Sequence, residues 1–196
     1  MANDYFKRTH WTARDEYYTP SILVEAIVPY LKMRFTDATI WCPFDTKNSE
    51  FVLCLREAGF NVVHSHLWTG EDFFKYEPKH YDAIISNPPF TLKREVFRRL
   101  FDLKKPFAML MGLPILNYQD VGNFFFGYQE KGQNLQLLVF DKKVSFDGNT
   151  SSFNTSFFCS GILQRDLMFH HLPHNNSRKH YVASRMIIDQ PEEEEE

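Results

Sequence analysis

The residues of this sequence best suited to chemistry are four consecutive ones, Asn87-Pro88-Pro89-Phe90, which follow an apolar run directly. Two prolines in a row restrict the backbone and remove two N–H donors, so the loop presents carbonyl oxygens as acceptors. The side-chain oxygen of Asn87 and the carbonyl of Pro88 are neutral acceptors that suit the two N–H groups of an exocyclic amine. Phe90 adds a ring on which a base taken out of its stack can lie. A turn that merely ends a strand is the alternative interpretation.

An exocyclic amine on a nucleobase is a poor nucleophile, because its lone pair is delocalised into the ring. Two acceptors that each take one N–H favour a tetrahedral nitrogen, whose lone pair can attack the methyl group of a sulfonium. Neutral acceptors suffice, since the nitrogen becomes acidic only after it has been alkylated. The tetrapeptide therefore predicts methyl transfer to the amine of a base.

Two other stretches carry a resemblance to a known family. Glu16-Tyr17-Tyr18-Thr19-Pro20 precedes a predicted helix, and Gly70-Glu71-Asp72-Phe73-Phe74 combines an acid with aromatic residues. Together with the tetrapeptide, they resemble phage-type DNA adenine-N6 methyltransferases over roughly residues 14–163. The resemblance implies a Rossmann-like class I methyltransferase fold, S-adenosylmethionine as cofactor and nucleic acid as substrate, DNA being favoured over RNA. It also implies that catalysis belongs to Asn87, Pro88, Pro89 and Phe90.

The same resemblance implies a cofactor site. Tyr18, Thr19 and Pro20 would flank the methionine end of the cofactor. Asp72 would accept a hydrogen bond from the cofactor's adenine amine, and Phe73 would pack on the adenine ring. There are two structural alternatives: Thr19-Pro20 also suits the start of a helix, and Asp72 also suits a solvated turn.

The sequence departs from the family pattern at two places. Trp41-Cys42-Pro43-Phe44-Asp45-Thr46-Lys47 contains no glycine, although close approach of the backbone to the cofactor favours glycine. Pro43 and Phe44 are retained there, and Asp45 is a candidate for the methionine amino group. His64-Ser65-His66 stands where an acid for the ribose hydroxyls is expected. A catalytically degenerate binding protein or partner subunit is therefore one alternative function, and methylation of RNA or of a glutamine amide is another.

A histidine-rich segment near the end invites a metal interpretation. His170 and His174 have helical spacing, and Cys159 lies upstream, but Pro173 interrupts any helix between them. We therefore expect a polar surface loop and no metal site.

Basic residues follow the tetrapeptide on one predicted helix. They suit phosphates that flank an extruded base, and they suit a solvated helix face equally well. These residues are Lys93, Arg94, Arg98 and Arg99, with Lys104 and Lys105 just beyond them.

The apolar periodicity predicts elements that alternate along the chain. Helices are expected at about residues 20–31, 48–58, 93–103 and 117–130, with Pro29 shortening or kinking the first. Strands are expected at 38–42, 61–63, 81–86, 106–113, 135–140 and 153–163. Such alternation predicts an α/β, doubly wound, mostly parallel sheet that is covered on both faces. Ligands bind such sheets outside the carboxyl ends of the strands, which is where the tetrapeptide lies.

The bulk properties set the remaining expectations. The chain has 196 residues and is 43% hydrophobic and 24% charged, which fits one globular domain at 14–190, with a segment 1–13 and an acidic, disordered tail 191–196. The net charge is −3, and without Glu192–Glu196 it is 22 basic residues against 20 acidic ones, or +2. Three scattered cysteines predict a reducing cytoplasm (the host's, for a phage protein), and the lack of a long apolar run predicts no membrane segment. Sequence-specific members of the family carry a separate recognition region, and the residues outside about 14–163 are few, so the resemblance implies either relaxed specificity or a protein partner for target recognition.

Overall fold

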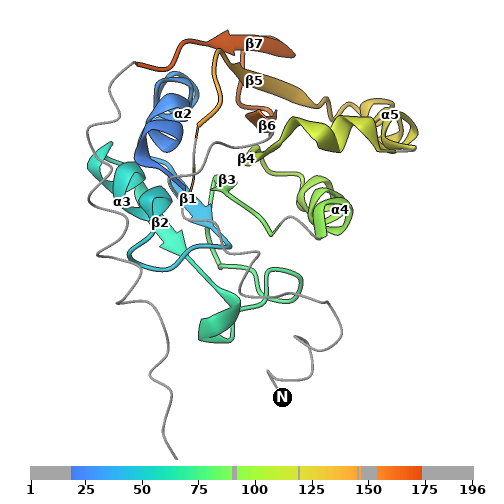
Figure 1. Ribbon diagram of the computed structural model, residues 1–196. Coiled ribbons are helices and arrows are strands. Elements are labelled where there is room, and N and C mark those ends of the chain that lie inside the picture. Colours follow the sequence, from blue (N-terminus) through green and yellow to red (C-terminus); the bar gives the residue numbers. More distant parts are fainter. Residues whose placement is uncertain (1–18, 90–91, 119, 145, 147–153, 174–196) are drawn as a thin grey trace, which may run out of the picture.

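One mixed sheet with helices on both faces organises the chain (Figure 1). The computed structural model describes residues 19–173 except 90–91, 119, 145 and 147–153. The strands are β1 (Thr39–Cys42), β2 (Asn61–His64), β3 (Ala83–Ser86), β4 (Phe107–Gly112), β5 (Gln136–Phe140), β6 (Thr155–Ser160) and β7 (Leu167–His170). The α-helices are α2 (Ser21–Arg34), α3 (Glu50–Glu57), α4 (Lys93–Leu103) and α5 (Val121–Gln129), and the 3-10 helices are η2 (Leu67–Thr69) and η4 (Leu113–Asn117).

The strand order is β2-β1-β3-β4-β6-β5-β7. The first four of these strands are mutually parallel, whereas β6 is antiparallel to both of its neighbours, and β7 is parallel to β5. From β1 the chain first builds outward to β2, then returns to add β3 on the other side of β1. The sheet therefore has its topological switch point between β1 and β3, where ligands bind in sheets of this kind.

The two faces of the sheet bury separate apolar clusters, because successive side chains of a strand point to opposite faces. On β1, Ile40 and Cys42 belong to the cluster shared with α2 and α3, and Trp41 belongs to the cluster shared with α4. Figure 1 shows α2 and α3 on one side of the sheet and α4 on the other. The doubly wound prediction is therefore confirmed.

Helix α4 has the predicted bounds and the predicted apolar face. Its buried residues are Val96, Phe97, Leu100 and Phe101. Arg99, which we expected to point outward, is half-buried instead, and its guanidinium lies 5.4 Å from the ring centroid of Phe73. The aliphatic stem and flat head of an arginine make such burial against an aromatic ring favourable.

Several predicted elements are corrected by the structure. Helix α2 continues past Pro29 to Arg34. Proline lacks the N–H that would bond to the carbonyl four residues earlier, and the loss of this one hydrogen bond does not end the helix. The helix expected at 117–130 is a 3-10 helix followed by the shorter α5. The strand β7 was not predicted, and His170, expected in a surface loop, is its last residue.

The ends of the predicted domain, at residues 14 and 190, lie outside the described residues. Within the described part of the chain, no helix is both long enough and apolar enough to cross a bilayer.

Candidate functional site

The carboxyl ends of β1 and β3 meet at the switch point. Their parallel register pairs Ile40 with Ala83 and Trp41 with Ile84. Each strand ends within two residues of that pairing, so the loops that begin at Pro43 and at Asn87 leave the sheet side by side. The topology thus brings together the two loops that the sequence analysis selected separately.

Asn87 is held by a residue from the beginning of the described chain. Its side-chain Nδ2 donates a hydrogen bond to Thr19 Oγ1 over 3.2 Å. The helix that follows Thr19 has Pro20 at its N-cap and no side-chain cap, so the alternative role of Thr19 as the helix cap is wrong. Assigning the amide nitrogen to Thr19 places the amide oxygen on the opposite side of the Asn87 side chain.

A second polar contact joins the two strand ends. The Ser86 hydroxyl, at the last residue of β3, donates a short hydrogen bond to Asp45 Oδ2 in the loop after β1. Both residues are buried, with Asp45 only 6% exposed. This contact ties the loop that carries Asp45 to the residue next to Asn87.

The loop after β1 is held by Ser65 in place of glycine-based turns. Ser65 accepts a hydrogen bond from Trp41 Nε1 over 2.9 Å, its N–H donates to the Cys42 carbonyl, and its own carbonyl accepts from the Asp45 N–H. The next residue, His66, caps η2 by accepting from the Trp68 N–H through Nδ1. The segment without the expected acid is therefore a well-bonded part of the site.

His64, the last residue of β2, is half-buried beside this loop. Burial lowers the pKa of its imidazole from the ordinary value of 6.5, with the nearby Arg56 charge as a smaller cause. At neutral pH the position usual for a ribose-binding acid therefore holds a neutral ring that can donate one hydrogen bond and accept another.

Asp72 lies in the turn after η2, with its side chain 12% exposed. Oδ1 accepts the Phe74 N–H over 2.9 Å, and Oδ2 faces the Lys75 ammonium at 3.7 Å. Among the described residues, Oδ2 is buried and accepts no hydrogen bond. The alternative of a turn acid is therefore confirmed in that Asp72 bonds within its own turn, but its carboxylate is mostly covered, so it is not a solvated one.

Phe73 is 3% exposed and lies inside an aromatic cluster. Its ring centroid is 4.8 Å from that of Phe44 and 5.5 Å from that of Trp41. Phe44 is half-buried and therefore keeps accessible surface beside this cluster. The predicted packing of Phe73 on a cofactor ring remains a prediction, and the structure adds Phe44 as a better exposed ring next to it.

The remaining predicted site residues differ in whether the structure describes them. Tyr18 and Phe90 lie outside the described residues, whereas Thr19, Pro20, Pro88 and Pro89 lie beside the switch point. Ser65 and Ser86 were not singled out from the sequence, although a serine at the end of a buried strand was the available signal.

The other reactive side chains of the described chain lie away from this site or are chemically inert. Cys42, Cys54 and Cys159 are all buried, and burial raises the pKa of each thiol, that of Cys54 to about 12. His170 shares a hydrogen bond with the Tyr30 hydroxyl, and His171 Nδ1 contacts the Asp141 carboxylate. None of the described cysteines can serve as a thiolate nucleophile at neutral pH.

Comparisons with known proteins identify the fold. No protein-family model and no curated protein matches the sequence. Among solved structures, the methyltransferase subunit of a type I restriction-modification system from Streptococcus thermophilus superposes with a TM-score of 0.54 at 13% identity over 80% of this chain. This chain spans 47% of that subunit, less than half of its length.

Two further structures are less similar. One is a class I S-adenosylmethionine-dependent methyltransferase from Listeria monocytogenes, at a TM-score of 0.47 and 11% identity, over 93% of this chain and 72% of that one. The other is a protein-(glutamine-N5) methyltransferase from Alicyclobacillus acidocaldarius, at 0.39 and 16%, over 72% of this chain and 92% of that one. The fold is shared with the Streptococcus thermophilus methyltransferase subunit, and at 13% identity the likeness concerns the fold alone.

Proposed function

We propose that this protein transfers a methyl group from S-adenosylmethionine to the exocyclic N6 amine of adenine in nucleic acid, with DNA as the favoured acceptor. The observation that carries the proposal is the position of Asn87-Pro88-Pro89 at the switch point, with the Asn87 amide oriented by Thr19. In sheets of this class, that position is where a ligand's reacting group lies. The Streptococcus thermophilus neighbour, described as part of a restriction-modification system, is in keeping with a nucleic-acid substrate.

The residues around the switch point fit the proposed cofactor. Asp72 Oδ2 is a buried acceptor without a hydrogen bond among the described residues, and an adenine amine supplies the missing donor. Phe44 offers a half-buried ring for the adenine face, supported from beneath by Phe73. In this proposal Thr19, Pro20 and Pro43 border the methionine end of the cofactor, and Asp45 accepts from its amino group.

The cofactor supplies a methyl group activated by a sulfonium. In the proposed reaction, the N6 lone pair forms the new C–N bond while the C–S bond breaks and its electron pair remains on sulfur. The resulting ammonium then loses a proton to solvent. The Asn87 Oδ1 and the Pro88 carbonyl accept the two N–H groups and thereby stabilise the tetrahedral nitrogen of the transition state.

Thr19 acts on this step through Asn87. By accepting from Nδ2, its hydroxyl determines which end of the amide faces the substrate, and that end must be the oxygen. The Ser86–Asp45 contact keeps the residue before Asn87 in register with the loop after β1. Both contacts prepare the acceptor geometry before substrate arrives, which is how positioned dipoles lower a barrier.

A second candidate function is a binding protein that keeps the fold without catalysis. Its support is the loop after β1, which has no glycine, together with a neutral His64 in the place of an acid. The contacts of Ser65 count against it, because they hold the glycine-free loop in place without exposing the backbone.

Calorimetry with S-adenosylmethionine, followed by incubation with the labelled cofactor and separate DNA, RNA and protein acceptors, tests the proposal. We expect measurable heat of binding, and label in the N6 position of adenine in DNA. Asp72→Asn should weaken cofactor binding, whereas Asp102→Asn, an exposed acid on α4, is the control and should not. Cofactor binding without any methylated acceptor would favour the non-catalytic function, and absence of binding would refute the proposal.

A further inference from the structure

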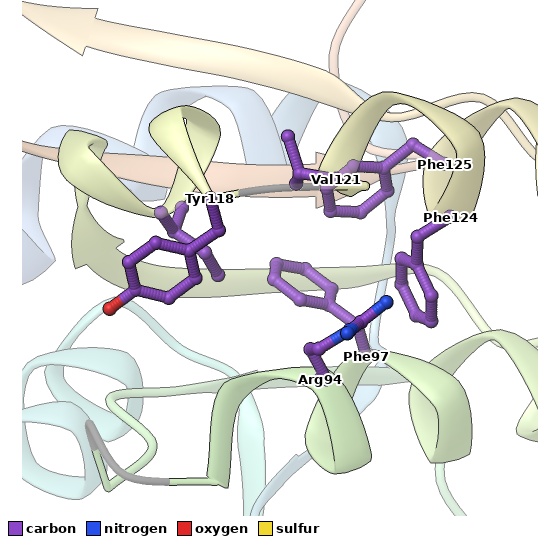
Figure 2. Close-up of a pocket in the computed structure, with 7 residues that line it drawn as sticks. Arg94, Phe97, Tyr118, Val121, Phe124 and Phe125 are labelled. Carbon is purple, nitrogen blue, oxygen red and sulfur yellow. The ribbon is translucent and has the colours of Figure 1, made fainter.

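A groove lined by aromatic side chains lies between α4, η4 and α5 (Figure 2). It is partly open to solvent, and its enclosed part is small. Phe97 forms its floor from α4, while Tyr118 and Phe124 contribute rings from the end of η4 and from α5. The proposed catalytic loop does not include any of these residues.

Two cations stand at the rim of this groove. The Arg94 guanidinium lies 5.7 Å from the ring centroid of Phe124, and the Lys93 ammonium lies 5.7 Å from that of Tyr118. Figure 2 shows Arg94 in front of the rings. The ring faces hold the two positive charges beside an apolar surface.

The aromatic surface at this groove is accessible. Tyr118 is 52% exposed, whereas Phe97 is almost fully buried. An exposed ring with one cation over it, beside a second ring with another cation over it, combines the two features by which proteins bind unpaired nucleotides: bases stack on rings, and phosphates meet the cations. An apolar peptide would use the ring and leave the cations without a role.

The groove also lies at the same edge of the sheet as the proposed catalytic loop. β3 leads into Asn87 and its parallel neighbour β4 leads into η4, with Ser86 paired to Met109. Lys93 and Arg94 begin the helix that follows the loop. A strand whose adenine reached Asn87 would therefore pass the groove with an adjoining nucleotide.

We propose that this groove binds a nucleotide next to the target adenine, with its unpaired base on Tyr118 and a phosphate on Arg94. This inference rests on the proposed function and extends it: the substrate is single-stranded nucleic acid, or a strand whose flanking base has left its pair. The specificity for adenine stays with the catalytic loop, because stacking accepts any base.

The first test measures binding of a short fluorescent single-stranded oligodeoxynucleotide by anisotropy, without cofactor. Tyr118→Ala should weaken binding about tenfold, within the range that base stacking on an aromatic ring contributes. Tyr118→Trp should restore it. Phe126→Ala, which removes an equally exposed ring of α5 outside the groove, is the matched control and should bind like wild type.

The contribution of base stacking to affinity is measured with the same strand carrying abasic positions on both sides of the adenine. Wild type should lose affinity for it, and Tyr118→Ala should bind both strands alike. Equal losses for Tyr118→Ala and Phe126→Ala, or wild-type preference for neither strand, would overturn the proposal. A ribonucleotide strand and a duplex, run in parallel, identify the natural source of the unpaired base.

The second test concerns the phosphate. Arg94→Gln should reduce the slope of log affinity against log salt by about 0.7, the amount expected for one phosphate of a single strand. Arg98→Gln, with the same loss of charge one turn further along α4, should leave that slope unchanged. An equal decrease in both variants would indicate diffuse attraction and no phosphate site at Arg94.

These outcomes are separable from failure of the proposed function. Oligonucleotide binding that depends on Tyr118, with no methyl transfer, would refute the catalytic proposal but support the nucleotide site at the groove. Adenine methylation whose turnover and KM are both unchanged by Tyr118→Ala would refute the nucleotide site at the groove and leave the catalytic proposal standing. Absence of salt-sensitive binding by wild type to every strand would refute both.

Discussion

At the scale of single residues, the site depends on which way one amide faces. In the proposed reaction Asn87 binds the substrate amine through its oxygen, and the structure has its amide nitrogen donating to the Thr19 hydroxyl over 3.2 Å. These two residues are separated by 68 positions, so only the folded chain brings them together. Two side chains of modest reactivity thus form an oriented acceptor.

Asn87→Ala should abolish methyl transfer and leave cofactor binding nearly unchanged, because the side chain is proposed to contact only the substrate amine. By analogy with a deleted oxyanion-hole donor, the loss of transition-state stabilisation is about 3–4 kcal/mol. Single-turnover kinetics with calorimetry of cofactor binding provide the measurement. Thr19→Val should lower turnover less, and Thr19→Ser should recover it. Turnover of Asn87→Ala within a few-fold of wild type would contradict the assigned role.

At the scale of elements, the loops are held by side chains that reach across strand ends. Ser65, after β2, accepts from Trp41 on β1, and Ser86, at the end of β3, donates to Asp45 after β1. Each contact links neighbouring parallel strands at their carboxyl ends. The edge of the sheet that carries the site is therefore cross-linked by hydrogen bonds.

Ser65→Ala should lower the free energy of unfolding by about 1–3 kcal/mol, because it leaves the buried Trp41 Nε1–H without an acceptor. Ser156→Ala is the matched control: among the described residues its buried hydroxyl makes no hydrogen bond, so its removal should cost little. Urea unfolding of both variants provides the comparison. Equal destabilisation would show that the loss arises from packing and that the Trp41 contact contributes nothing.

Acidification should lower the free energy of unfolding, because two strands of the sheet, β2 and β7, end in half-buried histidines. Burial lowers the pKa of His64 on β2 and of His170 on β7 below the ordinary 6.5. The unfolded chain then binds more protons than the folded one as the pH falls below about 6.5, so the free energy of unfolding decreases there and rises again toward neutral pH. Replacing either histidine with Gln should flatten this dependence, measured by unfolding across that range. A variant as pH-sensitive as wild type would contradict it.

At the scale of the whole molecule, charge is distributed unevenly along the chain. The net charge is −3, but residues 1–191 alone carry 22 basic and 20 acidic residues. The acidic run Glu192–Glu196 therefore reverses the sign of the total. It opposes the cations of α4 in any encounter with a polyanion.

Replacing Glu192–Glu196 with five glutamines should tighten binding of single-stranded DNA at low salt, because the net charge changes from −3 to +2. The gain should vanish at high ionic strength, where exposed charges are screened beyond about 3 Å. Anisotropy titrations over a salt series test this, and a gain that persists in high salt would point to a direct contact in place of long-range repulsion.

The fold class and the place of the Asn87-Pro88-Pro89 loop at a strand end were predictable from the sequence, because both depend on local patterns. Apolar periodicity indicates a helix or a strand within a few residues, as α4 illustrates with its predicted bounds and buried face. The pair of prolines after an apolar run indicates a stiff loop at a strand end. The strand at β6 was predicted, but its antiparallel direction and the additional strand β7 were not, since strand direction and edge pairing depend on partners far away in sequence.

The contacts of the site were decided by the tertiary structure alone. The sequence by itself determined that Asn87 and the loop containing Asp45 belong at strand ends. Only the strand order brought β1 beside β3, placed Thr19 on Asn87 and Asp45 on Ser86, and buried Phe73 beneath Phe44. The physical reason is that hydrogen bonds between residues tens of positions apart depend on how the sheet is assembled, which no local pattern of residue types specifies.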